Sequence, residues 1–215
     1  MGFEYVVQQG DHLSQIARDY GFSDYRTIWD HPDNQELKLK RKNPNVLFPG
    51  DVLVIPDRDL RQESCATDQR HRFKMQGPGL RLRLVLEDLY RTPIANAKCV
   101  LEVENHSRYV ITDANGRIDY PLPPQAKRAS LVIQDAQTPY DSVPIPIKIG
   151  HMDPVEEFSG QQSRLNNLGY FAGTADESDE SFLSAVEEFQ CDHGLAVDGI
   201  CGPNTQAKLK EVHGC

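Results

Sequence analysis

The sequence contains no apolar run long enough to cross a bilayer, which needs roughly 20 consecutive apolar residues. Its 215 residues are 39% hydrophobic and 26% charged, as is usual for globular domains in water. The amino terminus also lacks the basic start and apolar core of a secretion signal, and enters a strand-like pattern by Tyr5. We therefore expect a chain without a membrane span that is made in the cytoplasm and reaches any outside ligand by non-standard export.

Cysteine is scarce and scattered, with five residues that are too widely spaced for a disulfide framework. A zinc site could be built from Cys191, Cys201, Cys215, His193 and His213 if the fold brought them together, but their spacing matches no recognised ligand pattern. A disulfide between Cys201 and Cys215 is favoured over a metal site. We expect neither a metal nor a cofactor.

Catalytic constellations are also lacking. Cys99 and His106 lie in the same region, but Cys99 sits in an alternating strand and is expected to face the core. No two carboxylates are placed as a glycosidase pair, and His31, His71 and His151 lack metal-ligand spacing. The sequence predicts a protein that is not an enzyme.

The net charge of −9 is carried by the two ends of the chain. Residues 1–57 carry −3, residues 58–157 carry 0 and residues 158–215 carry −6. This balance argues against nucleic acid as a partner, because such binding needs basic residues that neutralise phosphates. The one basic cluster, Lys38, Lys40, Arg41 and Lys42, is interpreted as a solvated helix face.

The first 57 residues predict a strand, two helices and a final strand. Residues 5–8 form the first strand, and a helix follows from Leu13 to Gly21 with Asp11 as its cap. A second helix begins near Asp24 and is interrupted or ended by Pro32. After a charged stretch and a Pro-Gly turn, residues 52–55 form the last strand.

This segment resembles the LysM module. The resemblance rests on Tyr5-Val6-Val7, on Gly10 to Ala17, and on the Pro49 to Ile55 ending. It implies a groove in which backbone groups pair with the N-acetyl amides of a glycan. The implied groove residues are Gly10, Asp11, His12 and Leu13, facing Asn45, Val46, Leu47 and Phe48. Two departures lie near that groove: His12 replaces the usual Thr, and the region from Trp29 to Lys42 is longer than usual.

The middle of the chain predicts a linker over 58–76 and a small β-sandwich over 77–153. Alternation from Leu80 to Leu86 indicates a strand with one buried face, and five further strands are expected over 97–103, 109–112, 117–120, 129–133 and 145–149. Asn115-Gly116 predicts a hairpin turn. The Thr92 to Ala97 and Thr112 to Gly116 stretches resemble immunoglobulin-like or carboxypeptidase-regulatory-like modules, which implies a spacer or docking surface.

The last segment, 154–215, predicts three helices and resembles the three-helix peptidoglycan-binding domain. Leu165-x-x-Leu168-Gly169-Tyr170 and the run from Phe189-Gln190 through Asp198-Gly199 to Thr205 carry the resemblance. The candidate contact residues are Tyr170, Phe171, His193, Asp198 and Thr205. Because stem peptides carry carboxylates, the −6 charge of residues 158–215 is expected to weaken long-range attraction.

Together these patterns predict a multi-domain α+β protein that binds peptidoglycan without catalysis, as an adaptor acting at the cell wall or periplasm. The alternative is a structural or effector-loading accessory of a type VI secretion or phage-like contractile injection system, whose LysM module docks a spike or effector protein. The sequence is compatible with glycan or stem peptide as the wall ligand, and leaves the oligomeric state and cargo open.

Overall fold

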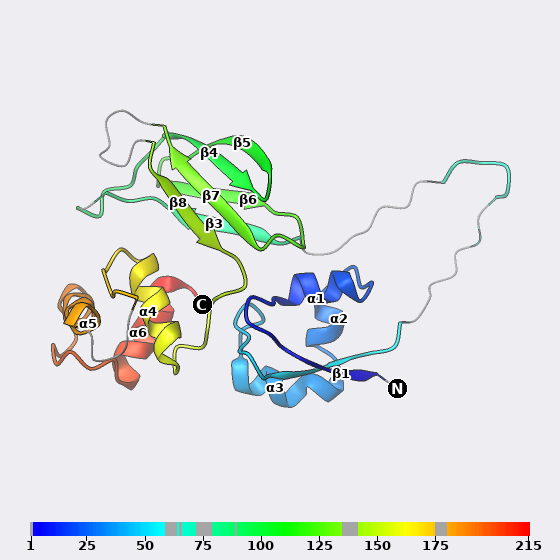
Figure 1. The fold of residues 1–215 in the computed structure, drawn as a ribbon, viewed down its shortest axis with the longest axis horizontal. Coiled ribbons are helices and arrows are strands. Elements are labelled where there is room, and N and C mark those ends of the chain that lie inside the picture. The colour runs from blue at the N-terminus through cyan, green and yellow to red at the C-terminus, as the bar shows by residue number, and fades with distance from the viewer. Residues whose placement is uncertain are drawn as a thin grey trace. The chain divides into compact units, whose positions relative to one another are not determined.

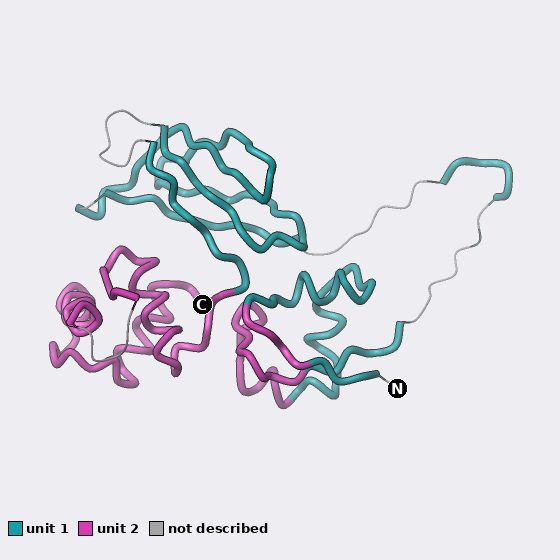
Figure 2. Tube along the Cα trace, viewed as in Figure 1, with its two compact units in different colours: residues 1–5, 10–35, 53–150 teal, residues 6–9, 36–52, 151–215 magenta. Residues whose placement is uncertain are grey.

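The computed structural model describes residues 2–58, 64, 66–71, 79–88, 90–134, 142–174 and 180–215. Most of the predicted linker over 58–76 therefore lies outside the described residues. The chain divides into two compact units, drawn in teal and magenta in Figure 2. The first comprises residues 1–5, 10–35 and 53–150, and the second comprises residues 6–9, 36–52 and 151–215.

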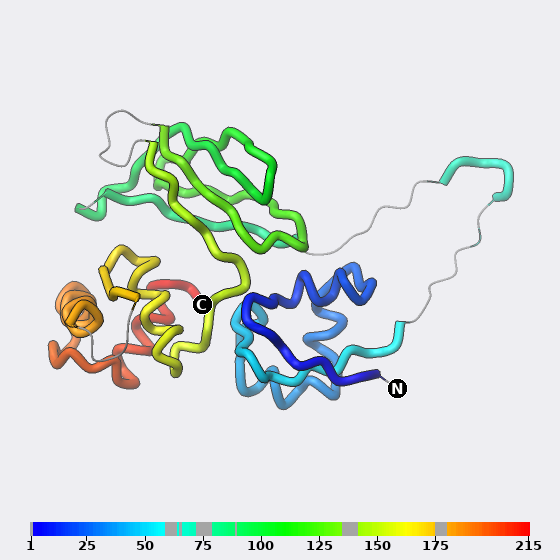
Figure 3. Tube along the Cα trace, in the orientation of Figure 1, coloured from blue at the N-terminus to red at the C-terminus, as the bar shows by residue number. Residues whose placement is uncertain are grey.

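The amino-terminal 58 residues form a short strand pair and a series of short helices, whose course is followed in Figure 3. In chain order they are β1 (Phe3–Val6), α1 (Leu13–Asp19), α2 (Arg26–Trp29), the 3-10 helix η1 (Pro32–Asn34), α3 (Gln35–Arg41) and β2 (Val52–Ile55). β1 pairs with β2 in a two-stranded sheet. The predicted strands and first two helices are present, but the first strand begins two residues earlier than expected.

The charged stretch after Pro32 is a third α-helix that the strand-helix-helix-strand prediction omitted. Pro32 opens η1, where its missing N–H is tolerated in a first turn, and α3 continues from it. Lys38 and Lys40 are exposed on α3, as expected for a solvated face. Arg41 departs from that expectation because its guanidinium binds the buried carboxylate of Asp51.

A buried amide joins η1 to the last strand of this region. Asn34 is 2% exposed and donates from Nδ2 to the carbonyls of Ile28 and Val54, at 2.8 Å each. Its Oδ1 accepts from the backbone N–H of Val54 at 2.7 Å. One side chain of η1 therefore satisfies backbone groups of α2 and β2, and it fixes how the inserted helical segment meets β2.

Residues 79–150 form two antiparallel sheets that share one core (Figure 1). One sheet pairs β3 (Arg81–Val85) with β6 (Arg117–Pro121), and the other has the order β5-β4-β7-β8. The bounds of the latter are β4 (Lys98–Val103), β5 (His106–Ile111), β7 (Arg128–Ile133) and β8 (Pro144–Lys148). Leu82 and Ile118 from the first sheet pack with Cys99, Leu101 and Leu131 from the second.

The Asn115-Gly116 turn does not form the predicted hairpin. It connects β5 to β6, and these two strands belong to different sheets. The turn itself is present, because the Asp113 carboxylate accepts from the N–H groups of Asn115 and Arg117 and Gly116 has φ +70°. A Cβ at Gly116 would overlap the carbonyl of Leu86, so the turn lies tightly against the segment that follows β3.

The carboxy-terminal region forms the three predicted helices, α4 (Phe158–Asn167), α5 (Glu180–Asp192) and α6 (Pro203–His213). Their shared core includes Leu165, Phe189 and Leu209, each with 0% exposure. Pro203 begins α6 at a position where proline is tolerated, and Gly214 ends it in the left-handed conformation. None of the described helices is long and apolar enough to cross a membrane.

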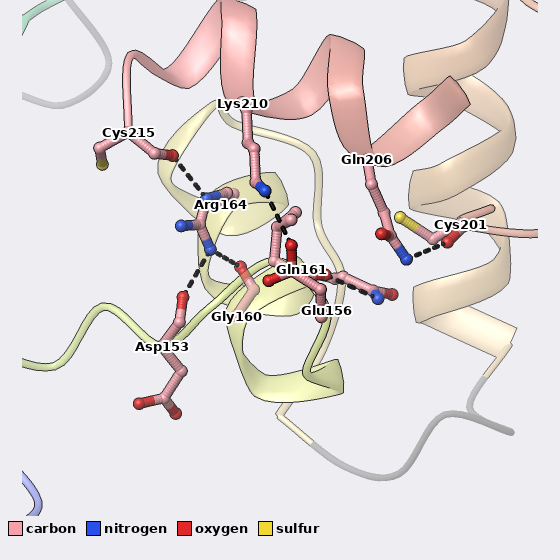
Figure 4. A network of polar contacts seen from close by, with 10 residues as sticks. Asp153, Glu156, Gly160, Gln161, Arg164, Cys201, Gln206, Lys210 and Cys215 are labelled. Atoms are coloured by element: carbon pink, nitrogen blue, oxygen red, sulfur yellow. Dashed lines mark hydrogen bonds and ion pairs between the residues drawn. The ribbon is translucent and has the colours of Figure 1, made fainter. Parts of the chain in front are cut away.

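Arg164 is buried in this helical region, and Figure 4 shows the polar contacts of its guanidinium. Nη1 donates to the carbonyls of Asp153 and Gly160 at 2.7 Å, and Nε donates to the backbone oxygen of Cys215 at 2.9 Å. A Cβ at residue 160 would overlap the carbonyl of Pro154. Glycine inside α4 thus permits the close approach that brings two of the three acceptors to Arg164.

The expected disulfide between Cys201 and Cys215 is not formed, and both residues are free thiols. The two cysteines flank α6, whose 11 residues span about 16 Å at ~1.5 Å per residue. A disulfide needs Cα atoms within about 7 Å of each other. The helix that the sequence predicts therefore separates the two thiols. No group of three or more metal-binding side chains occurs among the described residues.

Replacing Gly160 by alanine should destabilise the protein, although alanine normally favours a helix by about 1 kcal/mol over glycine. The added methyl must displace the Pro154 carbonyl, which we expect to cost about 1–3 kcal/mol in the free energy of unfolding. Gly79→Ala is the control, because its added methyl meets open space and Gly79 caps no helix. Denaturant unfolding of the full chain, followed by far-ultraviolet circular dichroism, measures both. A Gly160→Ala variant as stable as the wild type would refute the close approach of α4 to the carbonyl of Pro154.

Candidate functional site

The turn between β1 and α1 holds four of the predicted glycan-binding residues. Gly10 has φ +88°, which favours glycine, and Leu13 is buried at 3% exposure. His12, not Asp11, caps α1, because its Nδ1 accepts from the N–H of Gln15 at 3.3 Å. Asp11 does not cap the helix, since its carboxylate accepts instead from the hydroxyl of Tyr5 at 2.6 Å. Burial, followed by this hydrogen bond, raises the pKa of Tyr5.

His12 is 7% exposed and uses both ring nitrogens. Nε2 lies 3.2 Å from the backbone oxygen of Ala126 in the same compact unit. Burial lowers the pKa of His12, and the contact with Ala126 only partly offsets this effect. The imidazole therefore serves as a helix cap and as a bridge to another segment of its unit.

The other four predicted groove residues lie in the second unit, on the segment that follows α3. Val46 and Leu47 are buried, Asn45 is exposed and Phe48 is intermediate. Asp51 organises this segment by accepting two hydrogen bonds from Arg41 at 2.8 Å and one from the N–H of Phe48 at 3.0 Å. Burial alone would raise the pKa of Asp51, but these hydrogen bonds lower it on balance.

Gln190 lies near the end of α5 and holds the loop that follows this helix, and it was not among the predicted site residues. Its side chain is 1% exposed and makes five hydrogen bonds. Nε2 donates to Asp198, Ile200 and Thr205, while Oε1 accepts from the N–H groups of Asp198 and Gly199. The structure thus brings the predicted residues Asp198 and Thr205 together, as supports for the loop backbone.

The remaining predicted residues of this region differ in exposure. Tyr170 is 4% exposed, stacks edge-on against Phe189 at 5.5 Å and donates its hydroxyl to Asp192. His193 lies on the same Phe189 ring, with 4.4 Å between ring centroids. Phe171 is 77% exposed, so it is the predicted aromatic residue that is free to contact a ligand.

Further exposed apolar side chains surround the loop that Gln190 holds. Val197 is 56% exposed and Ile200 is 65% exposed, and both belong to the loop. Leu183 on α5 is half exposed, and a Cβ at Gly199 would meet its side chain at 3.0 Å. These residues offer an apolar surface beside exposed backbone, which suits the methyl and C–H groups of an acetylated sugar or a peptide.

Two family models match the ends of the chain. One, described as LysM domain, matches residues 5–29, and the other, described as "Putative peptidoglycan binding domain", matches residues 160–209. The chain carries a LysM domain and a peptidoglycan-binding domain. Both are binding modules rather than catalytic ones. No curated protein and no solved structure matches the chain.

The two matches cover most of the predicted site residues. The LysM match includes Gly10 to Leu13 but ends before Asn45. The match to the peptidoglycan-binding domain includes all five residues predicted there, and also Gln190 and Arg164. A signal for Gln190 was present in the sequence, because it follows Val186 by four residues on the apolar face of α5.

The Cys99 and His106 pair is not brought together. Cys99 has 0% exposure, as predicted from its strand. In the β4–β5 register it lies opposite Val110, whereas His106 lies opposite Val103. Four residues along a strand separate these positions by about 13 Å. This geometry offers no nucleophile and base in contact.

Gln190→Ala should destabilise the peptidoglycan-binding domain more than any single polar truncation on its surface. The variant leaves buried N–H and C=O groups unpaired, which costs about 1–3 kcal/mol in the free energy of unfolding. Gln206→Ala is the control, because Gln206 makes one hydrogen bond, to the carbonyl of Cys201. Hydrogen exchange should speed up over residues 195–202 in Gln190→Ala alone. Equal effects of the two variants on stability would contradict the central role of Gln190.

His213 should make the stability of this domain pH-dependent. Burial, and after it the positive charge of Arg164, lowers the pKa of His213 to about 4. Its Nε2 and Nδ1 already face Asn167 and Cys215, at 3.2 Å each. Because the unfolded histidine titrates near 6.5, the unfolded state binds more protons below that pH. The stabilising effect is complete above pH ~6.5 and is lost as the pH falls towards 4.

Scanning calorimetry of the full chain at pH 7 and pH 5 tests this dependence. Between pH 7 and pH 5 the free energy of unfolding of the wild type should fall by about 1–2 kcal/mol more than that of His213→Gln, since glutamine does not titrate. His71→Gln is the control, because His71 is an exposed residue outside the domain. The same loss in His213→Gln and wild type would assign the pH dependence to other groups.

Proposed function

We propose that this protein is a non-catalytic adaptor of the bacterial cell wall, with a peptidoglycan-binding module near each end and an immunoglobulin-like spacer between them. The observation that carries the proposal is the presence of two unrelated modules of the same binding class in one chain. Two modules on one chain raise the effective concentration of each at the wall, so modest single affinities are sufficient. The proposal places its action at the cell wall or periplasm.

The carboxy-terminal module supports this proposal through the chemistry of its loop. The amide of Gln190 fixes the loop backbone from inside, and Val197 and Ile200 project their apolar side chains outwards. A ligand that meets this loop encounters a preorganised backbone, so little conformational entropy is lost on binding. Phe171 adds an exposed ring of the kind that packs against sugar C–H groups.

A second candidate function is an accessory role in a type VI secretion or phage-like contractile injection system. In that case the LysM module docks a spike or effector protein instead of glycan. The observation that favours it is His12, where the LysM family usually has threonine. Its ring is buried and lies against a backbone oxygen, so this part of the module already makes a protein contact.

The purified chain should sediment with insoluble peptidoglycan sacculi without releasing soluble muropeptides. Phe171→Ser should lower the bound fraction, because an exposed apolar contact is removed. Tyr90→Ser is the matched control, since Tyr90 is 88% exposed in the region between the two modules. Release of muropeptides would overturn the non-catalytic assignment. Failure to sediment would reject wall binding and leave the protein-docking function.

A further inference from the structure

One cavity in the second compact unit is lined by residues from the end of α3, from the segment after it and from the peptidoglycan-binding domain. Its volume is about 360 Å³, within the roughly 300–1,000 Å³ typical of small-ligand sites. All of its lining residues belong to the same unit. They are Lys40, Arg41, Lys42, Asn43, Val46, Pro154, Val155, Glu156, Arg164, Lys210, Gly214 and Cys215.

The charged groups of this cavity are strongly unbalanced. Five cationic side chains and the side-chain carboxylate of Glu156 line it, together with the terminal carboxylate of Cys215. Lys210 pairs with Glu156 at 2.8 Å, and Lys40 and Arg41 both pair with Asp51. Arg164 donates to an oxygen of Cys215, so Lys42 is the cation of this cavity without a carboxylate partner among the described residues. An anionic ligand would complete this charge arrangement.

Arg164 provides the sharpest feature of the site. A guanidinium has five N–H donors, and this one is buried at 1% exposure. Nε and Nη1 donate to three backbone oxygens, whereas Nη2 has no acceptor among the residues that the structure describes (Figure 4). Removing a cation from water is costly. A buried guanidinium whose Nη2 has no acceptor at a cavity therefore favours a negatively charged acceptor there.

The uncharged residues that line the cavity indicate which class of anion fits it. Val46, Pro154 and Val155 contribute apolar surface, which a phosphate or a sugar hydroxyl would not use. A carboxylate next to a small alkyl side chain uses both the cations and the apolar wall. We propose that this cavity binds the free carboxylate of a peptidoglycan stem peptide. The proposal rests on the proposed wall-binding function and assigns the peptide, not the glycan, to this site.

Titration calorimetry of the full chain at about 50 mM salt tests the proposal, with diacetyl-L-lysyl-D-alanyl-D-alanine as the probe. The matched ligand is the same peptide with a carboxy-terminal amide, which should bind at least tenfold more weakly, because hydrogen bonds to charged groups are the strong ones. Inorganic phosphate is the third ligand and should bind more weakly than the peptide acid. Affinity for the peptide acid should also fall as salt is raised.

Two conservative variants change the charge of the cavity in opposite directions. Lys42→Gln should weaken binding of the peptide acid by about 3- to 5-fold, and Glu156→Gln should strengthen it by a similar factor. Lys208→Gln and Glu211→Gln are their controls, since these residues pair with each other on α6 outside the cavity. Arg164→Gln should abolish binding. That variant also removes three internal hydrogen bonds. Lys42→Gln and Glu156→Gln therefore test the site without disturbing the core.

The outcomes separate this inference from the proposed function. Equal binding of the acid and the amide overturns the carboxylate site, even if the protein still sediments with sacculi. Phosphate that binds as tightly as the peptide acid also overturns it, because the cavity would then be a general anion site. Binding of the acid with the expected variant effects, but no sedimentation with sacculi, supports the site and rejects the wall-binding function.

Discussion

The burial of one positive charge sets the geometry of the carboxy-terminal region of this protein. Arg164 is 1% exposed, and no side-chain carboxylate among the described residues binds it. Its charge is compensated by main-chain oxygens from the segment before α4, from α4 itself and from the terminal carboxylate of Cys215, which converge on it. Gly160 is required for this convergence, because a larger residue would hold α4 away from Pro154. Packing, backbone course and a cationic cavity therefore depend on the same side chain.

Two buried amides perform a similar task without charge. Asn34 joins η1 to β2, and Gln190 holds the loop between α5 and α6. An amide both donates and accepts, so one side chain satisfies N–H and C=O groups of the same irregular segment. Loops that carry candidate ligand contacts, such as Val197 and Ile200, gain a fixed backbone in this way. Their outer side chains remain available because the polar groups of the loop are satisfied from inside.

Local sequence patterns predicted the regular elements because their physical causes are local. Apolar spacing found α4, α5 and α6, and alternation found β3, since periodicity reports which face is buried. The errors arose where a tertiary contact decides. Gly116 lies tightly against Leu86 in the turn that leads to the other sheet, and Asp11 leaves the helix cap to His12 because the hydroxyl of Tyr5 donates to its carboxylate. Hydrophobic periodicity reports neither contact.

In the candidate sites, too, local motifs were predicted and the contacts made by the fold were not. Motif spacing selected Asp198 and Thr205 as contact residues, but Gln190, which belongs to the same motif, was not predicted to be the buried side chain that unites them. Arg164 was not predicted either, because a lone arginine in a helix is normally solvated. Their importance depends on acceptors that the fold supplies from 153–160, 198–205 and 215. A sequence pattern cannot show that these segments meet.

Net charge, finally, is a poor guide to the local field in a small module. Residues 158–215 carry −6, which predicts repulsion of an acidic stem peptide, yet Arg164 and Lys210 face a cavity that also receives Lys40, Arg41 and Lys42. At physiological salt the Debye length is about 8 Å, so exposed carboxylates farther from a ligand are largely screened, while cations in contact with it are not. The acidic surface then lowers the rate of encounter, and the basic cavity determines how tightly a carboxylate is held once it arrives.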